Sequence, residues 1–462
     1  MVVTLGVDIG TTSVKTCLVE DGHVLGAVKC SHNAKIIEDN RPMSHLFDEQ
    51  DPLLILKALD DCLEKIPCHQ ASSIRICGQM HGVVLWNPVN VPKCNTNLTL
   101  KCLYQSAITD VSRLITWQDK RCHQDFLKNL PCSPSFCKIA TGYGIASLLW
   151  LKRNQKLPDT YTLCGTIMDF VVWLLTQTKY VYMTTHSANS WGYFDVSKAC
   201  WEVEQIPELA HLLPRIVSVG HRSGSLVTKL HGMATDTVVY TALGDMQCSI
   251  HSSTPAPNEA ILNIGTSSQL SFMLKNDACT IKAIRDKCHS LDCVPYKNND
   301  VIITAASLTG GNVLDNFVST VQSWLLDLEC NSAMGKQDLF KKLEDLANTF
   351  RKTKSNTRTC LVIDPCVFGE RYSPNSLASA TNITTYNSSL GEITWALHRG
   401  IIENLSTMLP VELLKKHGVE AVVGTGGFLV ENCILKEAIE EVYKLPLRVS
   451  SDSDAAYGAA MF

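Results

Sequence analysis

Two stretches of the chain alternate apolar and polar residues on both sides of a turn that is rich in glycine and hydroxyl side chains. The first covers residues 5–19, and the second covers residues 262–274. Such alternation around a short turn predicts a β-hairpin in each place. The turns also match each other, since Asp8-Ile9-Gly10-Thr11-Thr12-Ser13 corresponds to Asn263-Ile264-Gly265-Thr266-Ser267-Ser268. A repeat with two copies, far apart in the chain, predicts two similar domains rather than a solenoid.

The other apolar patterns predict strands and helices that alternate in both halves of the chain. Apolar side chains recur at helical spacing in four segments: residues 53–63, 313–328, 339–350 and 392–409. Short runs that predict strands occupy residues 74–77, 301–305 and 421–423, and the last of these is typical of a buried strand. We therefore expect an α/β protein with two domains, residues 1–253 and residues 254–462. The proline-containing segment Thr254–Pro257 is the predicted hinge between them.

Composition excludes several classes of partner. The chain has 462 residues, a formal net charge of −4 and no basic runs, so nothing predicts binding to nucleic acid or to an anionic membrane. Its longest nearly apolar stretch, residues 167–175, is too short to span a bilayer. We expect no signal peptide, because no basic region followed by a long apolar run precedes the first predicted strand. The 20 cysteines are scattered without a CxxC pair, which favours free thiols in a reducing compartment and a cytoplasmic protein.

Glycine-rich turns are the candidates for binding phosphate or a nucleotide. The hairpin turns offer backbone N–H groups together with the hydroxyls of Thr11, Thr12, Ser13 and Thr266. Most such turns only connect strands, but the match between these two favours phosphate binding. Gly310-Gly311 and Gly424–Gly427 each precede a predicted helix, where glycine leaves room for a nucleotide to approach. Gly244-Asp245 adds a carboxylate at a sharp turn.

Three further segments place polar groups beside glycine or an aromatic ring. Gly78–Gly82 reads GQMHG and follows the strand at 74–77, where a ligand commonly binds in an open α/β sheet, although a plain strand-to-turn connection explains the same residues. Trp117–Arg121 reads WQDKR and suits a polyhydroxylated ligand. Alternatively, Trp117 is a core residue and Asp119 only pairs with Arg121. Residues 186–193 predict a polar and aromatic loop.

Taken together, these motifs resemble those of the FGGY family of carbohydrate kinases, within the superfamily of actin-like ATPases. The matches span nearly the whole chain and comprise DIGTTSVK at Asp8, GQMHG at Gly78, TWQDKR at Thr116, GDMQ at Gly244, NIGTSSQL at Asn263, Gly310-Gly311, FGER at Phe368 and GTGG at Gly424. The resemblance implies two actin-like (ribonuclease H-like) domains with a cleft between them. Within the family, GQMHGVVLW, LITWQDKRC and NSWGYF are most similar to the kinases of the seven-carbon ketose sedoheptulose.

This resemblance implies ATP-dependent phosphorylation of a ketose, most closely of sedoheptulose to sedoheptulose 7-phosphate. Asp245 matches the general base, and Asp8 matches the carboxylate that helps to place Mg²⁺. The residues that match the sugar site are Gln79, Met80, His81, Trp117, Asp119 and Tyr143. The residues that match the ATP site are Thr11, Thr12, Ser13, Gly265 and Thr266 in the hairpins and Gly311, Gly426, Gly427 and Asn432 in the nucleoside pocket. Phosphoryl transfer needs such a base, such a metal and close positioning of both substrates.

Three other interpretations stay open. The chain is a xylulose or ribulose kinase in one of them, although Met246 stands where xylulose kinases often carry a polar residue. An actin-like ATPase switch would use the same hairpins but would not need the segments at 78–82 and 117–121. A catalytically inactive sugar sensor would not need Asp8 and Asp245. We expect a sugar and ATP as small-molecule partners, neither nucleic acid nor a membrane, and a monomer or homodimer. The chain ends at Phe462, earlier than the resemblance leads us to expect.

Overall fold

The chain forms two compact units. The computed structural model describes residues 2–37, 44–89, 96–134, 139–158, 160–253, 256–288, 290–298, 300–329, 334–353, 361–370, 373, 375–450 and 454–462. The first unit comprises residues 1–254, 295–298 and 454–462, and the second comprises residues 255–294 and 299–453. Of the predicted hinge, Thr254 and Pro255 lie outside the described residues, as does Arg371 of the FGER motif.

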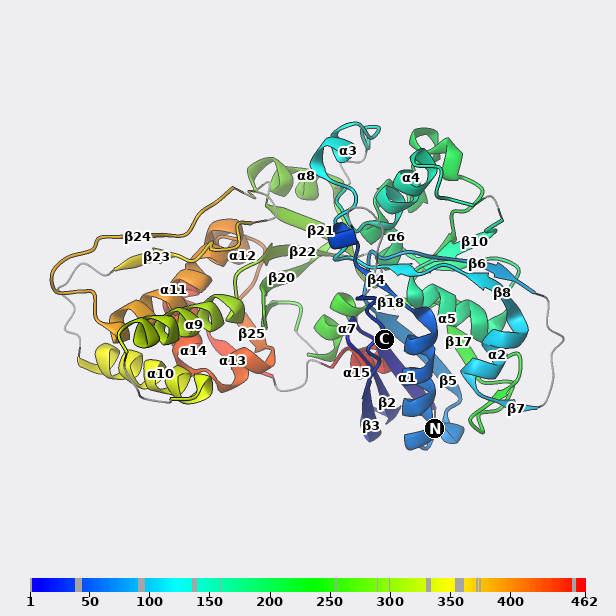
Figure 1. Cartoon of the computed structure of the whole chain (residues 1–462), viewed down its shortest axis with the longest axis horizontal. Coiled ribbons are helices and arrows are strands. Elements are labelled where there is room, and N and C mark those ends of the chain that lie inside the picture. Colours follow the sequence, from blue (N-terminus) through cyan, green and yellow to red (C-terminus); the bar gives the residue numbers. More distant parts are fainter. Residues whose placement is uncertain are drawn as a thin grey trace. The chain divides into compact units, whose positions relative to one another are not determined.

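The first unit is built on a seven-stranded mixed sheet (Figure 1). Its order along the hydrogen-bonded path is β15 (Arg222–Ser225), β17 (Val238–Tyr240), β5 (Ser73–Gly78), β1 (Val3–Ile9), β2 (Ser13–Glu20) and β3 (His23–Ser31), and β18 (Leu243–Gly244) also pairs with β5. Strands β1, β17 and β18 all run parallel to β5, whereas β2 and β3 continue from β1 as an antiparallel meander. Parallel strands bring their carboxyl ends to one edge of a sheet, so β1, β5 and β18 end side by side.

Smaller strands and helices complete the first unit. The helices are α1 (Pro52–Lys65), α2 (Leu100–Ala107), α3 (Gln124–Lys128), α4 (Gly144–Arg153), α5 (Ile167–Thr176), α6 (Thr185–Trp191), α7 (Asp245–Ser252) and α15 (Ala455–Met461). The short strands are β4 (Glu49–Gln50), β6 (Val84–Pro88), β7 (Asn97–Leu98), β8 (Ile108–Val111), β9 (Leu114–Ile115), β10 (Leu163–Gly165), β11 (Tyr182–Thr184), β12 (Phe194–Asp195), β13 (Cys200–Trp201), β14 (Arg215–Val217) and β16 (Lys229–Leu230). Helices α1, α2 and α5 bury their apolar faces in one core with the sheet.

The C-terminal helix α15 belongs to the first unit, whereas the predicted boundary placed it with the second. It lies against β1 and β2 (Figure 1, red beside dark blue), and two glycines permit this contact. A Cβ atom on Gly6 would lie 1.9 Å from the carbonyl oxygen of Ala456, and a Cβ atom on Gly458 would lie 1.9 Å from that of Cys248 on α7. The Cys77 thiol also donates a hydrogen bond to the carbonyl oxygen of Ala455 at 3.3 Å.

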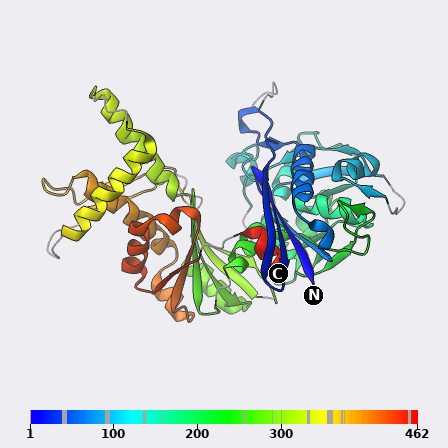
Figure 2. The ribbon, with the colours of Figure 1, turned by 90° about the horizontal axis from the view of Figure 1, so that it is seen from below.

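The second unit has a six-stranded sheet with its own apolar core. The order is β21 (Leu291–Pro295), β22 (Asp300–Ser307), β20 (Ser268–Lys275), β19 (Glu259–Ile264), β25 (Ala421–Thr425) and β26 (Leu447–Val449), and β23 (Val362–Asp364) pairs with β24 (Ser379–Thr381) separately. The helices are α8 (Ala278–Lys287), α9 (Gly311–Asp327), α10 (Lys336–Thr353), α11 (Leu390–Met408), α12 (Val411–Lys416), α13 (Gly427–Glu431) and α14 (Cys433–Tyr443). Figure 2 shows α9 and α10 as two long helices that cross each other.

The four helices and three strands predicted from apolar spacing are present, as α1, α9, α10, α11, β5, β22 and β25. Asp51 caps α1 by accepting a hydrogen bond from the backbone N–H of Leu53 at 2.8 Å, and α11 ends at Met408, before Pro410. The prediction of a loop at residues 186–193 is wrong. Most of this segment is helix α6, because its Trp191 and the following Tyr193 are fully buried in a local apolar core. Within the described ranges, no helix is long and apolar enough to cross a membrane.

Both predicted hairpins form, but their loops differ in length. In the first hairpin Ile9 pairs with Val14, which leaves residues 10–13 as the loop. In the second, Ile264 pairs with Ser268, which leaves residues 265–267. The sequence repeat therefore places Ser13 and Ser268 at different positions in the two hydrogen-bonded ladders. Local sequence identity does not fix hairpin register, because register depends on the turn geometry.

The close packing of α15 gives a prediction for stability. We expect Gly458→Ala to lower the free energy of unfolding by about 3 kcal/mol, because the added methyl group requires α15 and α7 to move apart. Gly26→Ala on β3 is the control, since a Cβ atom there meets its nearest neighbour at an ordinary 3.5 Å. Urea unfolding of the two variants measures the difference. Equal stability of Gly458→Ala and the control would show that α15 does not hold the first unit together.

Candidate active site

Two carboxylates of the first unit come together at the carboxyl ends of its parallel strands. Asp8 on β1 and Leu243 on β18 both lie in register with Cys77 on β5. Asp245 follows β18 directly as the first residue of α7. A Cβ atom on Gly78 would lie 2.4 Å from the carbonyl oxygen of Ile9, so glycine allows the backbones to approach at this point. The structure thus assembles Asp8 and Asp245, which are far apart in sequence, at one sheet edge.

Both carboxyl groups are held close to neutral pKa values. The pKa of Asp8 is raised to about 6, mainly by burial; Lys15 and Lys29 oppose this rise, and the charge of Asp454 contributes to it. Burial raises the pKa of Asp245 to about 7, and the neighbouring charge of Asp8 adds to the effect. The backbone N–H of Met246 donates to Asp245 Oδ1 at 2.7 Å and favours the ionised form. A carboxylate with such a pKa accepts and releases a proton near neutral pH, as a general base must.

The first hairpin loop presents only part of the predicted phosphate-binding set. Thr12 is exposed, but Ser13 is buried within β2. Thr11 lies between two other segments: its carbonyl oxygen accepts a hydrogen bond from Gln50 Nε2 at 2.8 Å, and its Oγ1 accepts one from Trp117 Nε1 at 3.0 Å. The side chain of Trp117 therefore contacts the hairpin loop directly, and its ring is not part of the core, since it is 37% exposed.

The segment after β5 brings His81 against Tyr143. Their rings stack with centroids 4.6 Å apart and an interplanar angle of 21°. His81 Nδ1 lies 2.7 Å from the carbonyl oxygen of Ser190, which can only accept, so Nδ1 carries the proton. His81 has a φ of 76°, an uncommon value for a residue with a side chain. Met80 and Gln79 of the same segment are buried. The three predicted sugar-site segments, at 79–81, 117 and 143, thus lie within one unit, where His81 contacts Tyr143.

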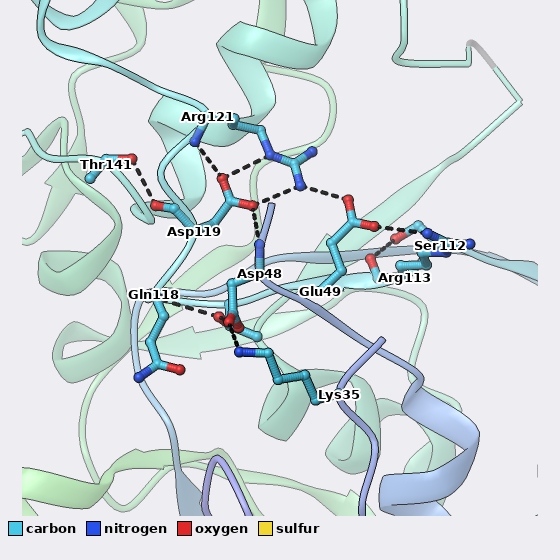
Figure 3. Close-up of polar contacts among 10 residues, drawn as sticks. Lys35, Asp48, Glu49, Ser112, Arg113, Gln118, Asp119, Arg121 and Thr141 are labelled. Carbon is cyan, nitrogen blue, oxygen red and sulfur yellow. Dashed lines mark hydrogen bonds and ion pairs between the residues drawn. The ribbon is translucent and has the colours of Figure 1, made fainter. Parts of the chain in front are cut away.

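Asp119 differs from the other candidates because its carboxylate is completely engaged (Figure 3). Arg121 donates to it from Nε and Nη2, both at 2.8 Å, and the backbone N–H of Asp48 donates to Oδ2 at 2.9 Å. Arg121 Nη2 also pairs with Glu49 at 2.6 Å. Asp119 is fully buried, so its carboxylate stabilises the loop after β9 rather than facing a ligand. The sequence had left open a simple pair between Asp119 and Arg121, and the structure contains that pair.

A cavity of about 340 Å³ lies beside this network. Arg121, Glu49 and Arg113 contribute its polar lining, and Phe47, Trp150 and Tyr161 contribute aromatic rings. None of the sugar-site candidates lines it. We therefore keep this cavity separate from the candidate active site.

In the second unit, the candidate nucleotide residues gather around the second hairpin loop. The first N–H groups of α9 are used in packing: Gly311 donates to the carbonyl oxygen of Gly265 at 2.8 Å, and Asn312 donates to that of Thr266 at 3.2 Å. Thr266 itself is exposed. Gly265 and Gly427 face open space, since a Cβ atom on either would meet nothing within 4 Å.

Two other glycine and asparagine candidates in this unit have structural roles. Gly426 has a φ of 94°, and a Cβ atom there would lie 2.5 Å from the carbonyl oxygen of Ile264. Asn432 is buried and caps α14: its Oδ1 accepts from the backbone N–H of Leu435 at 3.0 Å, while its Nδ2 donates to Glu344 at 2.6 Å and to His398 at 3.2 Å. Every polar atom of the Asn432 side chain is thus engaged within the protein, which leaves none for a nucleoside.

Gln50 carried no functional expectation from the sequence, and His186 was singled out only as part of the polar segment at 186–193. Gln50 on β4 contacts both the first hairpin and Gln79. His186 on α6 is fully buried beside Gly244, with Nδ1 3.4 Å from the backbone nitrogen of Gly244, and burial lowers its pKa to about 3. Hydrogen bonds between distant segments leave no periodic pattern, so spacing alone does not reveal such residues. The position of Gln50 directly before the Asp51 cap is the one local signal.

Comparison with known proteins identifies the family of the chain. A family model described as "FGGY family of carbohydrate kinases, N-terminal domain" matches residues 3–251. The chain belongs to the FGGY family of carbohydrate kinases. The kinase is similar to the human protein named sedoheptulokinase, at 36% identity over 99% of this chain and 96% of that protein. Xylulose kinase from Staphylococcus xylosus is 23% identical over 100% of this chain and 90% of its own length.

Solved structures show the same fold. Xylulose kinase from Rhodospirillum rubrum superposes on this kinase with a TM-score of 0.76 at 16% identity, covering 99% of this chain and 88% of that one. This similarity confirms the predicted α/β fold of the actin-like sugar kinases. The family assignment confirms that the protein is an enzyme, a carbohydrate kinase whose substrates are a sugar and ATP.

The raised pKa of Asp245 predicts how stability depends on pH. Its ordinary value is 3.8 and its value in the folded protein is about 7, so folding takes up a proton between these limits and stability falls as the pH rises through them. We expect Asp245→Asn to raise the melting temperature more at pH 8 than at pH 5, because the asparagine never becomes charged. Asp21→Asn, at an exposed turn, is the control. The same shift at both pH values would contradict a raised pKa for Asp245.

Proposed function

We propose that this kinase transfers the γ-phosphoryl group of ATP to sedoheptulose and forms sedoheptulose 7-phosphate. Identity supports this sugar, since it is 36% with human sedoheptulokinase and 23% with a xylulose kinase over comparable lengths. The observation that carries the chemistry is the pair formed by Asp8 and Asp245, both partly or fully buried at adjacent strand ends, with pKa values raised to about 6 and about 7.

Asp245 is the general base of this proposal. Its carboxylate takes the proton of the sugar hydroxyl while the hydroxyl oxygen forms a bond to the γ-phosphorus of ATP. The bond between that phosphorus and the bridging oxygen of ADP breaks, and the proton remains on Asp245 until it passes to water. A pKa of about 7 suits this role, because a much lower value would make the carboxylate too weak a base and a much higher one would leave it protonated.

The site also fits Mg²⁺. This ion prefers few carboxylates, with water and substrate phosphates as its other ligands. Asp8 offers one carboxylate. Its negative charge also raises the pKa of Asp245, and a bound cation would offset this charge. Mg²⁺, when bound, would neutralise charge that develops on the phosphate oxygens.

For the sugar, we propose contacts from Gln79, Met80, His81, Trp117 and Tyr143. The stacked rings of His81 and Tyr143 form a flat wall. The exposed face of Trp117 suits the carbon face of a sugar. Asp119 stabilises the loop that carries Trp117, because its carboxylate accepts a hydrogen bond from the backbone N–H of Asp48.

For ATP, we propose that the two hairpin loops bind phosphate, with Thr11, Thr12, Ser13, Gly265 and Thr266 as the residues at or next to the contact. Gly427 leaves space for the nucleoside, and Gly311 and Gly426 shape that space through their tight packing. We also propose a cytoplasmic location. All cysteines in the part of the chain that the structure describes are free thiols, as expected in a reducing compartment.

The direct test measures ADP release by the purified kinase with ATP and Mg²⁺, using sedoheptulose, xylulose, ribulose, glycerol or no sugar. We expect strong stimulation by sedoheptulose, and Asp245→Asn to reduce that rate by roughly 10³-fold with little change in ATP binding. Stimulation by xylulose or ribulose alone would reject sedoheptulose but keep the chemistry. Near-normal turnover of Asp245→Asn would reject Asp245 as the base.

Substitutions at two adjacent glycines should affect nucleotide binding and folding separately. We expect Gly427→Leu to fold normally and to weaken ATP binding at least tenfold, because its side chain would fill the open space beside α13. Gly426→Ala should instead lower stability, since its φ of 94° and its contact with Ile264 both disfavour a Cβ atom. Calorimetric titration with ATP and thermal unfolding make the comparison. Normal ATP binding by Gly427→Leu would remove Gly427 from the nucleotide site.

A further inference from the structure

A short series of hydrogen bonds joins the segment after β5 to the first hairpin loop through the side chain of Gln50. Gln79 Nε2 donates to Gln50 Oε1 at 3.0 Å, and Gln50 Nε2 donates to the carbonyl oxygen of Thr11 at 2.8 Å. The Gln50 side chain therefore connects a proposed sugar-binding residue with a proposed phosphate-binding loop. Nothing in the comparisons assigns a role to Gln50.

The direction of these bonds is fixed by their last acceptor. The carbonyl oxygen of Thr11 can only accept, so Gln50 must present its amide nitrogen there. The oxygen of Gln50 then faces Gln79, which must present its own amide nitrogen in turn. This leaves Gln79 Oε1 as a buried acceptor with no hydrogen-bond partner among the described residues. One backbone carbonyl in the hairpin loop thereby decides how the amide of Gln79 is oriented.

The surroundings hold Gln50 firmly in place. Gln50 is only 1% exposed. It belongs to β4, which pairs with β9 so that Gln50 lies opposite Leu114. The loop after β9 carries Trp117, whose Nε1 donates to Thr11 Oγ1. The two side chains that hold Thr11 therefore come from the paired strands β4 and β9 and the loop that follows them.

We propose that Gln50 is a positioning residue that holds the phosphate-binding loop at Thr11 and the sugar-binding segment at Gln79 in one mutual geometry. The inference rests on the proposed function for the roles of those two segments. It differs from a purely structural role, because each hydrogen bond of Gln50 serves a different substrate. Loss of the bond to Gln79 affects the sugar, and loss of the bond to Thr11 affects ATP.

The two hydrogen bonds of Gln50 predict different KM values for the variants Gln79→Met and Gln50→Met. Gln79→Met removes the first bond and keeps the second, so it should raise KM for the sugar about tenfold and leave KM for ATP unchanged. Gln50→Met removes both bonds at similar side-chain size, so it should raise KM for the sugar and KM for ATP about tenfold each. In the double variant, the sugar KM should rise by clearly less than the product of the two single effects, because both substitutions remove the same bond, although Gln79→Met also removes the proposed contact of Gln79 with the sugar.

Steady-state kinetics with the sugar that supports turnover measures these effects, and Gln70→Met, at an exposed site in the same unit, is the matched control. An unchanged KM for ATP in Gln50→Met, or independent effects that multiply in the double variant, would overturn the proposal. A change in kcat alone, with both KM values kept, would also overturn it.

Hydrogen exchange keeps the test independent of the sugar's identity and of turnover. In Gln50→Met, the amides of residues 10–13 should exchange about tenfold faster than in the unchanged protein, whereas residues 265–268 of the second hairpin should not change. Equal exchange at residues 10–13 would show that Gln50 does not hold the loop. Faster exchange without sugar-dependent activity would support Gln50 while rejecting the proposed function.

Discussion

The parallel pairing of β5 with β1 on one side and β18 on the other is the constraint on which the first unit depends. It sets Asp8 beside Cys77 and Gly244 beside Gly78, so the carboxylates of Asp8 and Asp245 meet although they are remote in sequence. A register change of one residue would turn Asp8 to the opposite face of the sheet. The small size of Gly78 keeps this register possible, since any side chain would collide with the backbone of Ile9.

The carboxylates of Asp119, Asp8 and Asp245 in this unit differ in their hydrogen-bond partners and therefore in their roles. Both carboxylate oxygens of Asp119 accept hydrogen bonds, from Arg121 and from the backbone N–H of Asp48, and the carboxylate has a structural role. Among the described residues, Asp8 and Asp245 form no comparable ion pair. Burial raises both pKa values towards neutrality, and the charge of Asp454 adds to the rise at Asp8 as the charge of Asp8 does at Asp245. Leaving charge uncompensated disfavours the folded state, and proteins retain such an arrangement where chemistry needs it. The partners of Asp119 and Asp245 therefore differ: Asp119 has an arginine, and Asp245 has the like charge of Asp8.

Much of this architecture could be predicted because it is local. Apolar residues at helical spacing predicted α1 and α11. The glycine turns located both hairpins, with Asp8 beside the first of them, and Gly244 marked Asp245. The features that escaped prediction depend on contacts between distant segments. The unequal hairpin loops, the burial of Asn432 under α14 and the role of Gln50 follow from tertiary packing. The segment at 186–193 was predicted as a loop because most of its residues are polar. Its aromatic residues Trp191 and Tyr193 pack in a core that the sequence pattern does not reveal.

Helix α15 has a consequence for the order in which the protein takes shape on the ribosome. The first unit needs residues 454–462 to cover β1 and α7, yet these residues are synthesised after the whole second unit. The sheet of the first unit therefore waits, with Gly6 and its apolar neighbours uncovered, while about two hundred intervening residues emerge at roughly 5–20 residues per second. For about ten seconds or more, the nascent chain therefore exposes apolar surface that α15 covers in the folded unit.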